Sequence, residues 1–192
     1  MGRTKEFDPD VALRAAMELF WRRGYEATSM QDLVDHLGIG RASIYATFGS
    51  KHELYLSALD RYCEGMDGTT LAALSQSGPA LPAVRAVLRS FVENALADEE
   101  RKGCMVTNTA VECLPHDQQA ARRVDASHDA IETALTGGLI RAQSQGELAG
   151  DRDPRAIARF LVTFLQGLQV IARTGNRRRL TDAVEQALTL LN

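Results

Sequence analysis

A four-residue interruption between two short helical segments restricts the folds open to this chain more than any other feature. Residues 37–40 read Leu-Gly-Ile-Gly, and the apolar residues on either side of them recur at helical spacing. The pattern predicts one helix that ends near His36 and another that runs from Arg41 to about Phe48. Two short helices joined by a tight turn that contains glycine are typical of a helix-turn-helix.

Residues that can cap a helix mark the start of the helices around this turn. Thr28 followed three places later by Gln31 has the form of a capping box, in which side chains satisfy free backbone N–H groups at a helix start. Ser50 and Glu53 repeat that form. We therefore expect a helix to begin just after Thr28 and a long helix to begin after Ser50.

The rest of the chain also indicates helices. Alanine and leucine recur every three or four residues, whereas the alternation typical of strands is hard to find. Further helices are expected over residues 8–24, 82–96, 104–114, 117–145 and 154–173 and in a last segment that reaches Leu191. The predicted fold is all-α, with a three-helix helix-turn-helix domain in residues 1–50 and a helical domain in residues 51–192.

The cysteine count and the hydropathy bear on where the protein acts. Three cysteines, an odd number without a Cys-x-x-Cys pair, argue against a disulfide framework and fit a reducing compartment. No signal peptide precedes Asp8, and no stretch approaches the roughly 20 apolar residues that a membrane span requires. The sequence predicts a soluble, cytoplasmic protein without a membrane partner.

The overall charge does not by itself indicate a nucleic-acid-binding protein. The formal net charge is -3 at pH 7, and residues 1–50 hold slightly more acidic than basic side chains. Non-specific affinity for DNA normally depends on a basic surface. Contact with DNA must therefore come from the local placement of cations and helix ends.

The segment from Arg41 to Phe48 nevertheless suits the major groove of DNA. Ile44 and Phe48, four residues apart, can face a core and leave the polar side chains between them to project outward. Arginine pairs well with guanine, and threonine offers a hydroxyl and a methyl group to thymine. Lys51 and the neighbouring helix starts suit phosphate. The candidate DNA-binding residues are Thr28, Ser29, Arg41, Ser43, Tyr45, Thr47 and Lys51.

About fifty consecutive residues resemble the N-terminal domain of TetR-family transcriptional regulators. The matching positions are 19–20, 24–29, 33–34, 37–39, 43–45, 48, 51 and 53–54. The resemblance implies that Lys51 contacts phosphate and that Arg41, Ser43, Tyr45 and Thr47 lie at the groove. One departure is Gly40, where the family usually has serine or threonine as a cap; the expected cost is only a few tenths of a kcal/mol.

The same resemblance implies how the rest of the chain is organised. A long fourth helix leads into a ligand-binding and dimerisation domain. The last two long helices, at about residues 154–191, form a four-helix bundle with those of a second subunit. Residues 102–112 resemble a motif found in one TetR subgroup, and they identify no ligand.

Several polar groups within apolar helical segments are candidates for a ligand site. The candidate ligand-binding residues are Met105, Asn108, Thr109, Glu112, His128, Phe164 and Leu168. The polar members equally suit internal hydrogen bonds of a helical bundle, and Phe164 and Leu168 suit a dimer core as well as a pocket. Cys104 and Cys113 allow a further alternative, a sensor of metal or oxidant, although buried cysteine usually acts as a small hydrophobic residue.

These patterns together predict a ligand-responsive repressor. It would bind a partly palindromic operator in double-stranded DNA as a homodimer, and a small-molecule effector would release it. No GxSxG, HExxH or glycine-rich phosphate loop occurs, so we expect no enzyme activity, cofactor or metal site. The alternative is a small-molecule carrier or enzyme that uses the helical bundle without specific DNA binding, which the acidic net charge favours. The sequence specifies neither the effector nor the operator.

Overall fold

The structure, a computed structural model, describes residues 7–192 apart from the side chains of Asp67 and Leu71. Within that range it contains nine α-helices and no strand. The helices are α1 (Pro9–Arg23), α2 (Met30–Leu37), α3 (Arg41–Phe48), α4 (Lys51–Ser75), α5 (Ala80–Ala97), α6 (Met105–Cys113), α7 (Gln118–Ser144), α8 (Pro154–Ala172) and α9 (Arg177–Thr189). The predicted all-α fold is confirmed.

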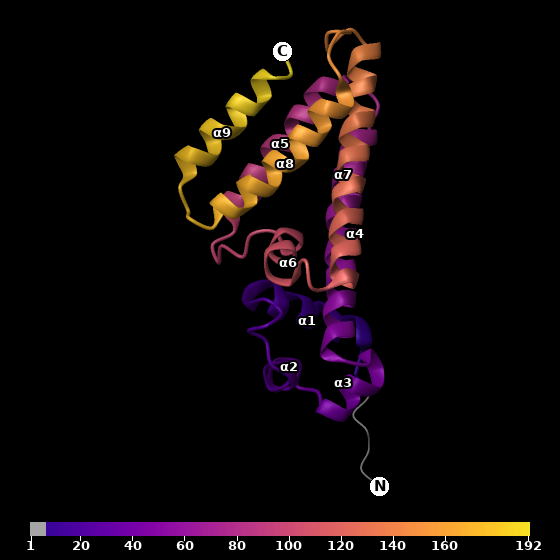
Figure 1. Cartoon of the computed structure of the whole chain (residues 1–192), viewed down its shortest axis with the longest axis vertical. Coiled ribbons are helices and arrows are strands. Elements are labelled where there is room, and N and C mark those ends of the chain that lie inside the picture. The colour runs from indigo at the N-terminus through magenta and orange to yellow at the C-terminus, as the bar shows by residue number, and fades with distance from the viewer. Residues whose placement is uncertain (1–6) are drawn as a thin grey trace.

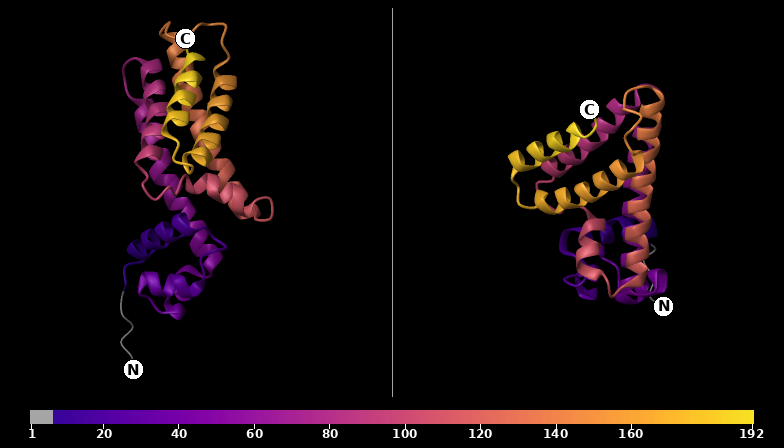
Figure 2. Two further views of the ribbon diagram at one scale, coloured as in Figure 1. Left: turned by 90° about the vertical axis from the view of Figure 1, so that its left-hand side faces the viewer. Right: turned by 45° about the horizontal axis from the view of Figure 1, so that its top comes forward.

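The helices form an elongated molecule whose two ends come from different parts of the chain (Figure 1). The first three helices gather at one end, and α5, α8 and α9 lie at the other end with the C-terminus. α4 and α7 run side by side along the long axis and connect the two ends, as Figure 2 also shows. α6 lies between the ends, against α4 and α7.

The start of α2 differs from the prediction by one residue. Ser29, not Thr28, is the N-cap: its hydroxyl accepts the N–H of Asp32, and the Asp32 carboxylate accepts the N–H of Ser29. These bonds from Ser29, helped by Arg23, lower the pKa of Asp32 to about 2. Thr28 is fully buried, and its hydroxyl donates to the carbonyl of Gly24. The predicted capping box is therefore correct in kind and wrong in its residues.

Each end of the molecule has its own hydrophobic core. The first core joins α1, α2, α3 and the start of α4 to parts of α6 and α7. The second core joins the far part of α4 to α5, α7, α8 and α9. Because α4 and α7 contribute to both, the two ends are parts of one continuous packed structure.

Two glycines inside α7 leave the helix uninterrupted. Glycine in a helix interior costs about 1 kcal/mol relative to alanine, yet α7 continues through Gly137 and Gly138. A Cβ atom on Gly138 would come within 3.0 Å of Cγ2 of Val84 on α5. The missing side chain therefore allows α5 and α7 to pack closely at this point.

The length and composition of α8 contradict the prediction that no apolar stretch approaches membrane-spanning length. α8 has 19 residues and would qualify by those two criteria alone. One side of α8, which includes Leu161 and Leu165, packs into the second core. On its other side Phe160 is 46% exposed and Val170 is 48% exposed. α8 therefore carries apolar side chains on both sides, and other helices of this chain cover one of the two sides.

Candidate nucleic-acid interface and ligand cavity

α3 is anchored by one side and presents the opposite side outward. Ile44 is fully buried in the first core, and Phe48 packs against that core. The exposed side chains of the helix include Arg41, Tyr45 and Thr47, whereas Ser43 is half-buried. Gly40 supplies the N-cap without a side-chain hydrogen bond. The predicted outward face of this helix is present, at the end of the molecule away from the C-terminus (Figure 1).

Lys51 lies next to this face, at the first position of α4. Its Nζ stands 4.2 Å from the centroid of the Tyr25 ring, which is a cation–π contact. Burial, reinforced by the nearby carboxylate of Glu26, raises the pKa of the Tyr25 hydroxyl, so the ring beneath the cation stays neutral. The contact holds a positive charge beside a helix N-terminus, where backbone N–H groups attract anions.

The two candidates at the start of α2 have different environments. Ser29 is exposed, whereas Thr28 is fully buried. A buried hydroxyl that already donates to a backbone carbonyl cannot reach a phosphate. Thr28 therefore stabilises the turn between α1 and α2 from inside. Of these two candidates, only Ser29 belongs to the surface formed by α2, α3 and the start of α4.

The predicted ligand residues on α6 do not form a pocket together. Met105 is buried in the first core. Thr109 and Tyr55 share a buried hydrogen bond of 2.7 Å, and Asn108 donates to the carbonyl of Lys102. These contacts correspond to the internal hydrogen bonding that the sequence left open as an alternative.

Glu112 on α6 contacts the helix-turn-helix end of the molecule. Its two carboxylate oxygens accept the backbone N–H groups of Tyr25 and Glu26, at 3.0 Å and 2.8 Å. A Cβ atom on Gly24 would lie only 2.8 Å from one of those oxygens, so a glycine is needed for this approach. Glu112, predicted to bind ligand, thus ties α6 to the α1–α2 turn.

The other three predicted ligand residues lie on α7 and α8. Leu168 is buried in the second core. Phe164 is half-buried and stacks on Phe160 with ring centroids 6.1 Å apart. Nε2 of His128 is buried and has no hydrogen-bond partner among the described residues. None of the seven predicted ligand residues lines the main cavity, which other helices form.

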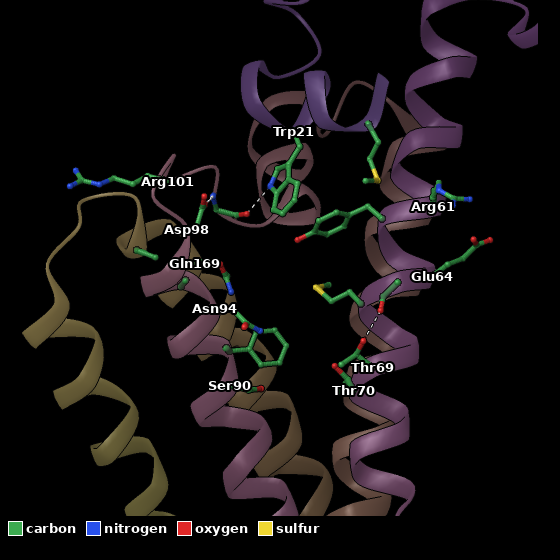
Figure 3. Close-up of a pocket in the computed structure, with 18 of the residues that line it drawn as sticks. Trp21, Arg61, Glu64, Thr69, Thr70, Ser90, Asn94, Asp98, Arg101 and Gln169 are labelled. Carbon is green, nitrogen blue, oxygen red and sulfur yellow. Dashed lines mark hydrogen bonds between the residues drawn. The ribbon is translucent and has the colours of Figure 1, made fainter. Parts of the chain in front are cut away.

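The main cavity opens between α1, α4 and α5 and has a volume of about 770 Å³ (Figure 3). Small-molecule sites typically have volumes of roughly 300–1,000 Å³. Its apolar walls come from three helices and are formed by Met17, Trp21, Tyr62, Met66 and Phe91. This cavity was not predictable from the sequence, because each helix contributes only a few lining residues and no local spacing marks them.

Trp21 is the point where the cavity meets the helix-turn-helix end. Its Nε1 donates a 2.7 Å hydrogen bond to the carbonyl of Gly103 (Figure 3). Nζ of Lys102 stands 4.1 Å from the centroid of the indole, and the Tyr62 ring meets it edge-on at 5.0 Å. Since Trp21 belongs to α1, a molecule in the cavity would touch the same helix that packs against α2.

A polar contact joins the start of α4 to the start of α7, near the helix-turn-helix end of the molecule. Nε2 of His52 lies 2.6 Å from Oδ2 of Asp117, the N-cap of α7. Partial burial works against ionisation of Asp117, but the N–H of Ala120 and the His52 side chain outweigh it and lower the pKa of this carboxyl. The start of α7 is therefore fixed to the start of α4.

The two cysteines that suggested a sensor occupy opposite ends of α6. Cys104 is its buried N-cap, and Cys113 is its last residue. Burial raises the pKa of the Cys113 thiol, which disfavours the thiolate that binds metals and reacts with oxidants. No group of three or more potential metal-binding side chains is found among the side chains that the structure describes.

The exposed α3 lies at one end of the molecule, and a cavity large enough for a small molecule lies beside α4 and α5. Together they define the class of protein, a helix-turn-helix protein that also has a cavity of ligand size. Residues 12–58 match the bacterial regulatory proteins of the tetR family, and residues 80–188 match the tetracyclin repressor-like C-terminal domain. The chain therefore belongs to the TetR family of helix-turn-helix transcriptional regulators, which confirms the family predicted from the sequence.

Individual relatives agree with this assignment. The HTH-type transcriptional regulator YezE of Bacillus subtilis (strain 168) is 43% identical over 195 residues, which cover 100% of both chains. The HTH-type transcriptional repressor ComR of Escherichia coli (strain K12) is 33% identical over 91% of this chain and 83% of ComR. A solved structure of the TetR-family regulator CifR, a cysteine mutant complexed with 26bp double-strand operator DNA, has a TM-score of 0.86 and 33% identity over 98% of each chain.

Proposed function

We propose that this regulator is a ligand-responsive repressor whose α3 enters the major groove of operator DNA. The observation that carries the proposal is the exposed polar face of α3, held outward by the burial of Ile44. CifR, similar over its whole length, was solved on operator DNA, and ComR is a repressor. The proposed DNA-contacting residues are Ser29, Arg41, Ser43, Tyr45, Thr47 and Lys51.

We assign DNA binding to residues 1–50 and ligand binding and dimerisation to residues 51–192. The exposed apolar side of α8, with Phe160 and Val170, suits the core of a symmetric bundle formed with α9 and the same two helices of a second subunit. A dimer would place two copies of α3 about one turn of DNA apart, which suits a partly palindromic operator. Such a protein acts on DNA in the cytoplasm and needs no catalysis.

The cavity beside Trp21 is the proposed effector site. It adjoins α1 and α4, and both helices belong to the first core together with α3. An effector that binds one arrangement of these helices better than another shifts the population toward that arrangement. We propose that the effector-bound arrangement no longer fits the operator.

A fluorescence-polarisation titration with duplexes that tile the DNA upstream of the gene tests this function. One duplex should bind at least about a hundredfold more tightly than its shuffled counterpart, because specific sites commonly exceed non-specific DNA by larger factors. The logarithm of the affinity should fall linearly with the logarithm of salt concentration. Equal, weak affinity for every duplex would contradict the proposal and favour the carrier or enzyme alternative.

A further inference from the structure

Most charged side chains around the cavity are directed away from its interior or hydrogen-bonded to other residues, and Arg14, which also lines it, is exposed on α1. Figure 3 shows Arg61 and Glu64 on the outer side of α4 and Arg101 pointing away from the cavity. Nη1 of Arg173 lies 3.3 Å from Oδ1 of Asn108, and the Asp98 carboxylate accepts the N–H of Gly103. Apart from Arg14, the charged groups therefore lie outside the interior, whose walls are formed by neutral side chains.

The aromatic wall of the cavity also remains neutral. Burial, together with the neighbouring Cys104, strongly raises the pKa of the Tyr62 hydroxyl, so Tyr62 keeps its proton. Met17, Met66 and Phe91 add apolar surface beside Trp21. An anion placed among these side chains would lose its hydration without gaining a partner of opposite charge. A cation would gain only the faces of aromatic rings, and Lys102 already occupies that of Trp21.

The interior nevertheless offers hydrogen bonds. The Thr70 side chain is 7% exposed, lines the cavity from α4, and makes no hydrogen bond with any other described residue. Across the cavity on α5, Asn94 is exposed at the edge of the cavity, and its amide likewise has no hydrogen-bond partner in the described part of the chain. The Thr70 hydroxyl is not fully enclosed and Asn94 is exposed, so both groups are accessible to a molecule in the cavity. Thr70 and Asn94 therefore mark two places where a bound molecule gains hydrogen bonds.

We propose that the effector is an uncharged molecule with a flat apolar body, packed against Trp21 and hydrogen-bonded to the hydroxyl of Thr70 and the amide of Asn94. This inference rests on the proposed role of the cavity as the effector site. In this arrangement Thr70 and Asn94 select the ligand by hydrogen bonding. The flat body follows from the aromatic walls, which favour stacked or edge-on rings.

Three probes that share one ring system test the class by isothermal titration calorimetry. They are 2-naphthamide, the anion 2-naphthoate and the cation 2-naphthylmethylammonium, each titrated into the full-length protein. We expect 2-naphthamide to bind most tightly, by about tenfold or more, since neither ion finds a counter-charge inside. If 2-naphthoate binds as tightly as the amide and Arg14→Ala or Arg61→Ala abolishes its binding, the site selects anions and the proposal is wrong. Failure of all three probes to bind also overturns it.

The substitution Thr70→Val keeps the shape of the side chain and removes its hydroxyl. It should weaken 2-naphthamide binding about fivefold or more, which is the size of one lost hydrogen bond. Thr181→Val is the matched control, because that hydroxyl bonds the carbonyl of Arg177 on α9, outside the cavity. Thermal unfolding of both variants shows whether they are folded. Undiminished binding to Thr70→Val would refute the assignment of Thr70.

The same preparations separate this inference from the proposed function. Operator binding is measured without any probe, so specific binding of DNA combined with no preference for the neutral probe refutes the ligand class alone. Selective binding of 2-naphthamide without specific binding of any duplex refutes the repressor function and leaves the class of ligand standing.

Discussion

Glu112 accepts the backbone N–H of Tyr25 across 87 positions of sequence, at a distance of 3.0 Å. The same carboxylate accepts the N–H of Glu26, so a single side chain of α6 holds the α1–α2 turn at two points. The cavity domain and the helix-turn-helix are therefore connected by polar contacts as well as by α4.

Removal of this carboxylate should loosen the connection. Glu112→Ala is expected to lower the free energy of unfolding by about 1 kcal/mol, because two exposed hydrogen bonds are exchanged for bonds to water. Operator affinity should fall several-fold, since α1 and α2 are held less firmly. Chemical denaturation and polarisation titrations measure the two effects. Glu93→Ala, which removes an exposed glutamate on α5, is the control. If the two variants have the same free energy of unfolding and the same operator affinity, Glu112 does not hold the α1–α2 turn in place.

Arg41 and Lys51 should affect DNA binding in different ways. Arg41→Ala is expected to lose about 1–3 kcal/mol of discrimination at one base pair, because arginine reads base edges. Lys51→Ala should weaken binding to every duplex alike and reduce the salt slope by about one, because it removes a phosphate contact. Titrations against single-base operator variants at several salt concentrations separate these outcomes. Arg178→Ala, on α9 at the opposite end, should bind like the parent, and parental binding by all three variants would disprove the contact assignment.

The open side of α8 should control assembly. Phe160→Glu places a charge in the proposed dimer core and should give a monomer at micromolar concentration, as measured by multi-angle light scattering. Val111→Glu is the matched control, because Val111 is 76% exposed and belongs to α6, outside the proposed bundle of α8 and α9. A parent protein that is already monomeric at this concentration would contradict the bundle of α8 and α9.

Asp32 should contribute stability that depends on acid. Its folded pKa of about 2 lies below the ordinary aspartate value of 3.8. The ionised form is thus favoured by folding, and this contribution is fully present above about pH 4 and is lost as the pH falls toward 2. The stability difference between the parent and Asp32→Ala should therefore shrink over that range in urea titrations at successive pH values. A difference that stays constant from pH 7 to 2 would argue against the ionised cap.

The helix-turn-helix was predictable because its signals are local. Gly38 adopts a positive φ of 64° as the C-cap of α2, and Ile44 lies at a spacing that must face inward. Such features depend on neighbours within one or two helical turns. Even there, Thr28 and Ser29 both suit a cap, and only the path of the chain after α1 decides that Ser29 is the one.

The ligand cavity was not predictable in the same way. Trp21, Thr70 and Asn94 are separated by dozens of residues and meet only because α1, α4 and α5 pack together. The polar residues of α6, such as Asn108 and Glu112, were assigned to ligand because sequence does not fix the rotation of a short helix about its axis. Tertiary packing turns them toward Lys102 and the α1–α2 turn instead.

Because α4 runs unbroken from Lys51 to Ser75, small displacements at the cavity are amplified at the DNA. At 1.5 Å of rise per residue, Thr70 lies about 29 Å along the axis from Lys51. A tilt of α4 by about 5° around Thr70 would therefore carry Lys51 sideways by about 2.5 Å. In a symmetric dimer the shifts of the two subunits add. A molecule that displaces α4 in the cavity by less than the diameter of an atom would therefore change the distance between the two copies of α3 by several ångströms.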